Sequence, residues 1–443
     1  MLRGDYLLFL GAAAGTFCVL VSDPARVPFV SRPAQALTAE GRPVELFREV
    51  YQLVHQRYVT SPDDSKLIEG AIKGLMRELD PHSEYLDMQT FRTIEEDARG
   101  VFGGLGVQGT MENGFLKVVA PVANSHAVKA GLRPGDLIVR IDGTPVRGLT
   151  IKQAIERMRG PVNSKIRLTI RRKDQPEPTE VSVVRDLMRV QTVFSQAIGE
   201  DVGYIRISKF NGLTAAGLHK ALKDLSTRIP ANRLRGFILD LRNNPGGVLE
   251  QAISVSSAFL SSGDIGTARG RNPDDNQLFT ATQTSSNLNR GKPLIVLING
   301  GSASAAEIVA GALQDRRRAT VLGTRSFGKG SVQSTSPIGD GNALKLTTAL
   351  YYTPSGHSIQ AKGITPDIEV MQEGWEAQRL RGAIDSEATL HNHLTGDGEE
   401  LAGSEAYVPS DSNDDKAMKM AVDLLRGVRS HPAFPANRTS THN

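Results

Sequence analysis

The chain has 443 residues, of which 39% are hydrophobic and 23% are charged, as is usual for a folded protein with about two or three domains. Its formal net charge of +4 is small for this length and argues against a dedicated nucleic-acid-binding protein, which would carry a concentrated basic face. Because Cys18 is the only cysteine, internal disulfides and zinc sites built from cysteine pairs are excluded.

The N-terminus indicates export. Arg3 precedes an apolar run over residues 6–21, which fits the core of a signal peptide and is at the short limit for a membrane span. Ala34-Gln35-Ala36 offers a cleavage site, but it lies far from the apolar run. Residues 1–36 are therefore predicted to be a signal peptide or a membrane anchor. The remaining chain is predicted to lie in the periplasm or at the periplasmic face of the inner membrane.

Residues 37–95 are predicted to form an N-terminal helical segment. Apolar residues recur at helical spacing over residues 44–58 and again over 68–79, and Asp80-Pro81 ends the second helix. Residues 96–185 read as a compact β-rich domain. Its predicted strands and single helix cover residues 115–119, 137–141, 165–170, 180–184 and 150–158.

Residues 186–371 alternate between strands and helices, which favours an α/β core with a mainly parallel sheet. The predicted strands lie at 202–207, 236–241, 293–299, 319–322 and 343–352, and the helices at 214–229, 249–260 and 304–314. Residues 372–443 are polar, with one helical patch over 414–425, and are predicted to be loosely ordered.

Two loops that follow predicted strands carry small residues, and such loops gather at the carboxyl ends of the strands. One contains Gly246-Gly247 and the other covers residues 300–305. Both lead into helices, whose N-terminal N–H groups and dipoles favour an anion. The glycine pair fits either a tight turn or half of an oxyanion hole. The segment Ser304-Ala305-Ala306-Glu307 likewise fits a helix capping box or a nucleophile site.

A third loop, residues 323–330, has the spacing of a phosphate-binding P-loop around Lys329. The sequence argues against that function, because Gly330 stands where a serine or threonine should hold magnesium and no helix pattern follows. Residues 104–109 similarly spell a dinucleotide-binding fingerprint, but a strand-like segment follows it in place of the required helix.

A catalytic serine needs a base. No Gly-x-Ser-x-Gly elbow is present, and His357 is the only histidine close to the core motifs in sequence. A lysine can serve if burial brings its pKa about 3 units below the ordinary ~10.4. Lys329 has no acidic neighbour in sequence, which permits this. Gln333 could hold the amine through a hydrogen bond or be an ordinary loop glutamine.

Four segments together carry a resemblance to a known family: residues 239–247 (LDLRNNPGG), 299–314 (NGGSASAAEIVAGALQ), 326–333 (SFGKGSVQ) and 345–367. From about residue 44 to residue 371 the chain resembles the C-terminal processing peptidases, also called tail-specific proteases. That family has a PDZ domain inserted ahead of an α/β protease core, where this chain has its β-rich domain.

The resemblance implies roles for individual residues. Ser304 would be the nucleophile, Lys329 the general base and Gln333 its orienting partner, with no metal or cofactor. The oxyanion hole would consist of the N–H groups of Ala305 and Gly246. Gly247 is the less favoured donor, and Ser302 and Glu307 keep capping roles.

The resemblance also implies a substrate-binding loop. The segment Phe102-Gly103-Gly104-Leu105-Gly106 matches the PDZ loop that captures a terminal carboxylate. Its successive N–H groups form an anion-binding nest, and the peptide adds to the sheet as a strand. Gly103, Gly104, Leu105 and Gly106 are therefore the expected substrate-binding residues.

The chain departs from the family pattern at Ala306, where a third serine is common, and at His357, where arginine is common. Neither removes a catalytic group. The resemblance implies a serine endopeptidase for protein substrates with exposed, apolar C-termini, with the PDZ domain gating the active site. Arg171 or Arg172 is a candidate reporter of tail occupancy. The competing hypothesis is a PDZ-based adaptor with an inactive core, and the sequence leaves homo-oligomer formation open.

Overall fold

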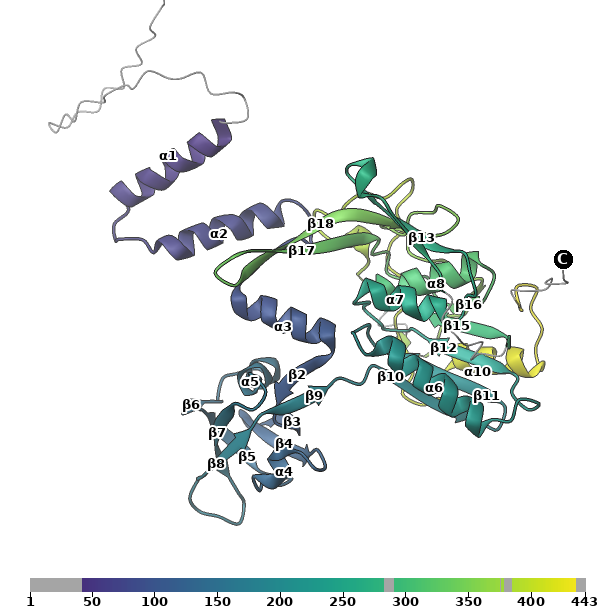
Figure 1. The fold of residues 1–443 in the computed structure, drawn as a ribbon, viewed down its shortest axis with the longest axis horizontal. Helices are drawn as coiled ribbons and strands as arrows, with labels where there is room; N and C mark the ends of the chain where they lie inside the picture. The colour runs from purple at the N-terminus through teal and green to yellow at the C-terminus, as the bar shows by residue number, and fades with distance from the viewer. Residues whose placement is uncertain (1–41, 283–290, 375, 378–384, 436–443) are drawn as a thin grey trace, which may run out of the picture. The chain divides into compact units, whose positions relative to one another are not determined.

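The structure is a computed structural model that describes residues 42–282, 291–374, 376–377 and 385–435 (Figure 1). The chain divides into two units, residues 1–68 and 69–443. The predicted signal peptide or membrane anchor over residues 1–36 lies outside the described residues. None of the helices that the structure describes has both the length and the apolar character needed to cross a membrane.

The first unit contains α1 (Arg42–Arg57) and the first residues of α2 (Asp64–Arg77). An ion pair of 2.5 Å joins His55 Nε2 of α1 to Asp64 Oδ1 of α2. No residue of α1 is buried. Its exposed apolar side chains include Val44, Leu46, Phe47, Val50 and Leu53. Such an apolar face is typical of a surface that contacts another protein.

The second unit begins within α2 and continues through β1 (Glu84–Leu86) and α3 (Met88–Arg99). The side chain of Asp87 caps the start of α3 by accepting the Thr90 N–H at 2.7 Å. Strand β1 pairs antiparallel with β18, one of the core strands. The predicted N-terminal helical segment, residues 37–95, therefore also contains a short strand at residues 84–86, which are too few to show a strand pattern in sequence.

The β-rich domain, residues 101–189, contains an antiparallel sheet in the order β3-β4-β5-β7-β8, with β6 beside β5. Its strands are β3 (Val107–Glu112), β4 (Phe115–Pro121), β5 (Leu137–Ile141), β6 (Thr144–Pro145), β7 (Lys165–Arg171) and β8 (Thr179–Val184). Two helices complete it, α4 (His126–Lys129) and α5 (Ile151–Met158). A separate pair, β2 (Val101–Gly104) and β9 (Asp186–Arg189), joins its two ends. The predicted boundary at residue 96 falls inside α3.

The first core sheet has the order β10-β11-β12-β15-β16-β19, and only the β10–β11 pairing is antiparallel. Its strands are β10 (Val193–Ile198), β11 (Val202–Ile207), β12 (Gly236–Asp240), β15 (Leu294–Ile298), β16 (Thr320–Gly323) and β19 (Ile368–Glu369). Every residue of β12 and β15 is buried. This explains their continuous apolar runs, because parallel strands are covered on both faces.

Helices cover both faces of the first core sheet. Side chains of α6 (Thr214–Arg228), α7 (Leu249–Ser257) and α8 (Ala305–Asp315) form one apolar cluster with this sheet. A second cluster on the other face contains side chains of α10 (Lys416–Arg426). The C-terminal segment was predicted to be loosely ordered, but around α10 this is wrong. Asp415 caps this helix and forms a buried ion pair of 2.8 Å with Arg242.

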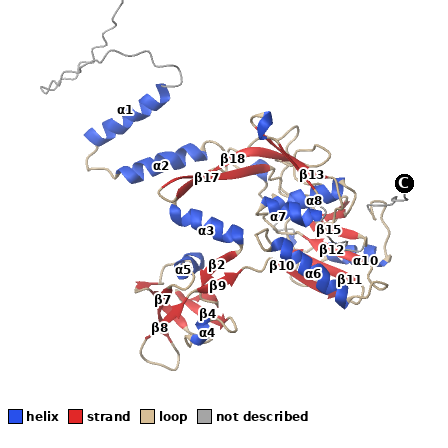
Figure 2. Cartoon of the chain, viewed as in Figure 1, coloured by secondary structure: helices blue, strands red, loops and turns tan. Residues whose placement is uncertain are grey.

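The second core sheet is antiparallel throughout, in the order β1-β18-β13-β14 with β17 on β18. Its strands other than β1 are β13 (Asp264–Gly270), β14 (Gln277–Thr280), β17 (Ser331–Gly339) and β18 (Asn342–Tyr352). Short 3-10 turns lie at Pro273–Asp275 and Glu387–Thr389. The long hairpin of β17 and β18 is drawn in red in Figure 2. The mainly parallel arrangement thus holds for the first core sheet only, and the prediction is wrong for the core as a whole.

Candidate active site

Ser304 lies between β15 and α8, at the end of a loop that begins with Asn299. Its backbone has φ 54° and ψ −116°, a conformation that costs a non-glycine residue about 1–3 kcal/mol and is concentrated at functional sites. Ser302, two residues earlier, is fully buried. Its Oγ donates to the Leu241 carbonyl at 2.8 Å and accepts the Asn299 N–H at 2.9 Å. Ser302 is therefore buried with satisfied hydrogen bonds, whereas Ser304 is strained and partly exposed.

The carboxylate of Glu307 connects the Ser304 loop to the Lys329 loop. Its Oε2 accepts the N–H groups of Ser304 at 2.7 Å and Lys329 at 2.9 Å. Its Oε1 accepts the Ser326 hydroxyl and the Gly328 N–H, both at 2.6 Å. Burial raises the pKa of Glu307 to about 7, while the four donors favour its ionised form.

Sequence reasoning recognised Glu307 only as a helix cap. The reach of Glu307 back to the Ser304 N–H confirms that part. Its contacts with the lysine loop were missed. The available signal was a single acidic residue at the start of a helix, Ala305–Asp315, whose next six residues are small or apolar. A charge that is fully buried in such a helix must have several donors around it.

The side chains of Lys329 and Gln333 lie together as predicted, with Nζ donating to Gln333 Oε1 at 2.9 Å. Burial lowers the pKa of Lys329, and the charge of Lys345 lowers it further. Three carboxylates act in the opposite direction, those of Glu387, Glu307 and Asp80. A lysine whose pKa is lowered in this way can hold a neutral amine and accept a proton.

The Gly246 loop lies directly against the Ser304 loop. A Cβ atom on Gly246 would be 2.7 Å from Ser304 Cβ and 2.9 Å from the Ala305 nitrogen, so only glycine fits there. The two small-residue loops therefore meet as the sequence predicted.

The donors in these two loops differ from the expected pair. The N–H of Gly246, a predicted oxyanion donor, is buried and already donates to Asn244 Oδ1 at 2.9 Å. Gly247 is exposed. Among the described residues, no hydrogen bond engages the N–H of Gly247 or of Ala305. Gly246 and Gly247 differ because the Asn244 side chain accepts the Gly246 N–H, and no sequence pattern predicted this contact.

The predicted carboxylate-binding loop divides into two parts. Gly103 and Gly104 belong to β2, and the Gly103 carbonyl accepts the Gly160 N–H at 3.1 Å. Leu105 and Gly106 follow the strand, with Gly106 at φ 73°. Within the described part of the chain, no hydrogen bond uses the N–H of Leu105 or Gly106. These two groups are therefore the ones that the loop leaves for an anion.

The other candidates are engaged elsewhere. Arg172 forms an ion pair of 2.8 Å with the buried carboxylate of Asp136, and the Arg171 guanidinium lies 5.1 Å from the centre of the Phe115 ring. Both contacts lie within the β-rich domain. His357 is exposed, and its Nδ1 lies 2.8 Å from Ser355 Oγ. A strand, β17, follows Lys329 where a P-loop would need a helix.

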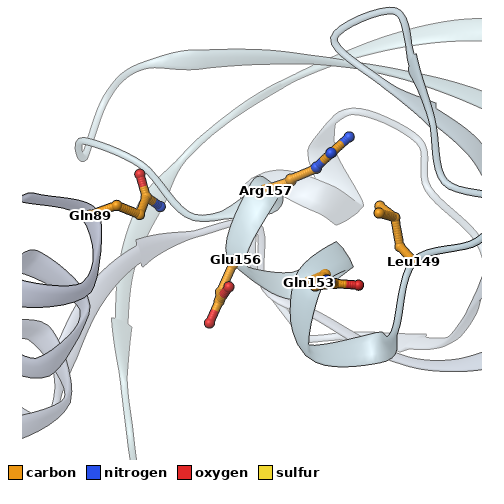
Figure 3. A pocket seen from close by; sticks show the side chains of 5 residues that line it. All are labelled: Gln89, Leu149, Gln153, Glu156 and Arg157. Atoms are coloured by element: carbon orange, nitrogen blue, oxygen red, sulfur yellow. The ribbon is translucent and has the colours of Figure 1, made fainter. Parts of the chain in front are cut away.

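A small pocket on the β-rich domain side of the molecule contains none of the predicted site residues (Figure 3). It is lined by Gln89, Leu149, Gln153, Glu156 and Arg157.

Comparisons with known proteins match three parts of the chain. Residues 201–370 match Peptidase family S41, and residues 117–172 match a PDZ domain. Residues 10–90 match the N-terminal domain of the activating protease CtpB. The first match contains Gly246, Ser304 and the lysine loop.

Full-length relatives give the same result. A carboxy-terminal-processing protease of Bartonella bacilliformis is 48% identical over 391 residues, which cover 88% of this chain and 89% of that protein. The carboxy-terminal processing protease CtpB of Bacillus subtilis is 34% identical over 371 residues, covering 83% of this chain and 76% of that protein. Among solved structures, a photosystem II D1 C-terminal processing protease matches with 27% identity and a TM-score of 0.43, covering 75% of this chain and 94% of that chain.

Proposed function

The chain belongs to the carboxy-terminal-processing proteases of peptidase family S41, and we propose that it is a Ser-Lys endopeptidase that cleaves protein substrates near their C-termini. One observation carries the mechanism. The Glu307 carboxylate accepts the backbone N–H groups of both Ser304 and Lys329, so it holds a strained serine and a partly buried lysine close together.

The reaction begins with attack of Ser304 Oγ on the scissile carbonyl carbon. The neutral amine of Lys329 takes the hydroxyl proton and then gives it to the leaving amine, which departs as the new N-terminus. Water hydrolyses the acyl-enzyme, with Lys329 again accepting a proton, and Ser304 is regenerated. Gln333 keeps the amine directed because its Oε1 accepts one of the Lys329 hydrogens.

The developing oxyanion would be bound by the N–H groups of Ala305 and Gly247. Both are without a partner among the described residues, and the Gly246 loop lies against the Ser304 loop. A donor of this kind is worth about 3 kcal/mol of barrier. This assignment replaces Gly246 by its neighbour.

The PDZ domain would bind the substrate's terminal carboxylate through the N–H groups of Leu105 and Gly106, with the peptide adding as a strand along β3. An apolar C-terminal side chain fits the surface of α5. Ile151 and Ile155, one helical turn apart, remain 40% and 38% exposed there. In this proposal, tail binding gates cleavage by the core.

We further propose that the protein is exported, and that residues 1–36 act as its signal peptide or membrane anchor. The apolar face of α1 supports self-association of the chain, because none of its residues is buried.

Degradation of an unstructured protein with an apolar C-terminus tests the proposed reaction. The wild type is expected to degrade it, whereas Ser304→Ala and Lys329→Arg are expected to be inactive. Equal degradation by the wild type and Ser304→Ala would refute the mechanism. If the wild type binds such tails without cleaving them, the adaptor hypothesis is correct.

A further inference from the structure

The turn that ends the N-terminal helical segment lies next to the lysine site, although the mechanism above does not use it. Asp80 and Ser83 in this turn are 4% and 8% exposed. They reach the core because β1 pairs with β18, with Glu84 opposite Lys345. Thr347 lies on β18 two residues after Lys345, and it pairs with Gln333 of β17.

A chain of hydrogen bonds runs from this turn to the lysine. Lys329 Nζ donates to Gln333 Oε1 at 2.9 Å, and Gln333 Nε2 donates to Thr347 Oγ1 at 3.1 Å. Thr347 Oγ1 in turn donates to Asp80 Oδ1 at 3.1 Å. Gln333 Nε2 also donates to Ser331 Oγ at 3.0 Å.

Asp80 sets the direction of this chain because an ionised carboxylate only accepts hydrogen bonds. Burial opposes ionisation of Asp80, but the Ser83 hydroxyl and the N–H groups of His82 and Ser83 outweigh it and hold its pKa below the usual range. These donors lie 2.6 to 2.9 Å from the carboxylate oxygens. The single proton of the Thr347 hydroxyl must therefore point to Asp80.

The direction matters because a glutamine amide has two orientations of nearly equal shape, and only one offers an acceptor to a lysine amine. With its proton directed to Asp80, the Thr347 hydroxyl presents a lone pair to Gln333 and so requires the amide nitrogen. Gln333 Oε1 then faces Lys329. In the flipped orientation the amide N–H groups would face the amine instead.

We propose that Asp80 is a positioning residue for the general base, acting through Thr347 to keep Gln333 in the orientation that accepts from Lys329. This inference rests on the proposed Ser-Lys mechanism. It gives the N-terminal segment a role in the active site, although Asp80 lies 267 residues before Thr347 in sequence.

The charge of Asp80 adds a second, separable effect, because it favours the protonated amine of Lys329. The other charged groups that act on this amine are Lys345 of β18, Glu307 of α8 and Glu387, whose carboxylate is paired with His82 at 2.9 Å. A variant that removes only the charge of Asp80 should lower the pKa of Lys329. The rising limb of the pH–rate profile should therefore move to lower pH.

Variants at Thr347 and at Asp80 separate the effect of the hydrogen-bond network from the effect of charge. Thr347→Val breaks the series of hydrogen bonds between Lys329 and Asp80, whereas Thr347→Ser keeps a hydroxyl. Thr348→Val is the matched control, since the exposed Thr348 hydroxyl pairs with Ser334 on the same two strands at 2.8 Å and, within the described residues, with no other group. Asp80→Asn removes the charge. Its side-chain oxygen is kept in place by the His82 and Ser83 N–H groups, which already donate to Oδ1.

The experiment measures kcat and KM against pH for the full chain, with thermal unfolding as a check on folding. Thr347→Val should lower kcat about 10- to 100-fold with KM nearly unchanged, because a misplaced base costs rate and not substrate binding. Thr347→Ser and Thr348→Val should stay within about twofold of the wild type. Asp80→Asn should retain most of the maximal rate and show its rising limb at lower pH.

Thr347→Val with the kcat and pH profile of Thr348→Val would overturn the inference. Asp80→Asn with an unmoved limb would refute the separate effect of the Asp80 charge on Lys329. If Thr347→Val does not fold, Thr347→Ser still tests the inference, because a kcat more than about twofold below that of Thr348→Val would show that the Thr347 hydroxyl alone does not keep Gln333 in place. Ser304→Ala and Lys329→Ala are run in parallel. Activity in either would refute the proposed mechanism itself, whereas their inactivity beside an unaffected Thr347→Val refutes only the role of Asp80.

Discussion

The two sides of the candidate active site are held by different kinds of structure. Ser304 takes its position from the loop after β15 and the start of α8, a stretch of a few residues. Lys329 contacts nearby Gln333 but depends also on groups from distant segments, including Glu307 and Asp80. The strained backbone of Ser304 is a local feature, which a short sequence can build. A lysine base needs a lowered pKa, which only surrounding tertiary structure can supply.

Among the side chains that the structure describes, Glu307 is the one with hydrogen bonds to both sides, so replacing it should give the largest effect. Each of the two carboxylate oxygens of Glu307 accepts two hydrogen bonds, whereas the glutamine in Glu307→Gln has a single side-chain oxygen to accept them. The variant should lose about 3 kcal/mol of folding stability and at least ~100-fold in kcat, because buried N–H groups lose their acceptor. Chemical denaturation and steady-state kinetics measure the two losses.

Glu250→Gln is the matched control, because Glu250 is exposed in the first turn of α7. It should change neither quantity measurably. A Glu307→Gln variant that behaves like it would show that the two sides of the site are held independently.

Gly246→Ala should damage the nucleophile side alone. The added Cβ would lie 2.7 Å from Ser304 Cβ, so the serine must move and kcat should fall about 100-fold. The pH at which activity rises should stay where it is, because the surroundings of Lys329 are unchanged. Kinetics over a pH series measures both.

Gly356→Ala controls for backbone strain, since Gly356 has φ 86°, close to the φ 92° of Gly246, but open space around it. Both substitutions should lose about 1 kcal/mol of stability to backbone strain, Gly246→Ala should lose more because of the clash with the Ser304 loop, and only Gly246→Ala should affect catalysis. Equal kinetics in the two variants would contradict the close approach of the Gly246 and Ser304 loops.

Lys345→Met should change the base side alone and have the smallest effect on the maximal rate. The positive charge of Lys345 lowers the pKa of Lys329, so removing it raises that pKa. The neutral amine then forms only at higher pH, and the rising limb of the pH–rate profile should move upward. Lys345→Arg keeps the charge and should leave the limb in place. A limb that moves downward in Lys345→Met would exclude Lys329 as the titrating group.

Local patterns predicted much of the site and less of its surroundings. The strand-to-helix turn at Ser304 and the Lys329–Gln333 contact follow from short segments, and both are present. The second core sheet was missed because β1 has three residues and the β17 pattern contains Pro337 and Gly339. The donor choice between Gly246 and Gly247 depends on one side chain, Asn244, whose direction no periodicity reveals.

Long-range polar contacts were the hardest to predict. Asp80 has the appearance of a helix stop in sequence, and its bond to Thr347 exists only because β1 joins β18. The helical patch in the C-terminal segment was found, but its burial against the first core sheet was not, because the surrounding residues are polar.

The pH dependence of Ser304 acylation tests whether Lys329 is the general base for Ser304. A serine-reactive fluorophosphonate is added over a pH series, and the labelled residue is identified by mass spectrometry. The account predicts labelling of Ser304 at a rate that rises through an apparent pKa below the ordinary ~10.4 of lysine, and loss of labelling in Lys329→Ala. Equal labelling of Ser304 in the wild type and in Lys329→Ala would contradict it.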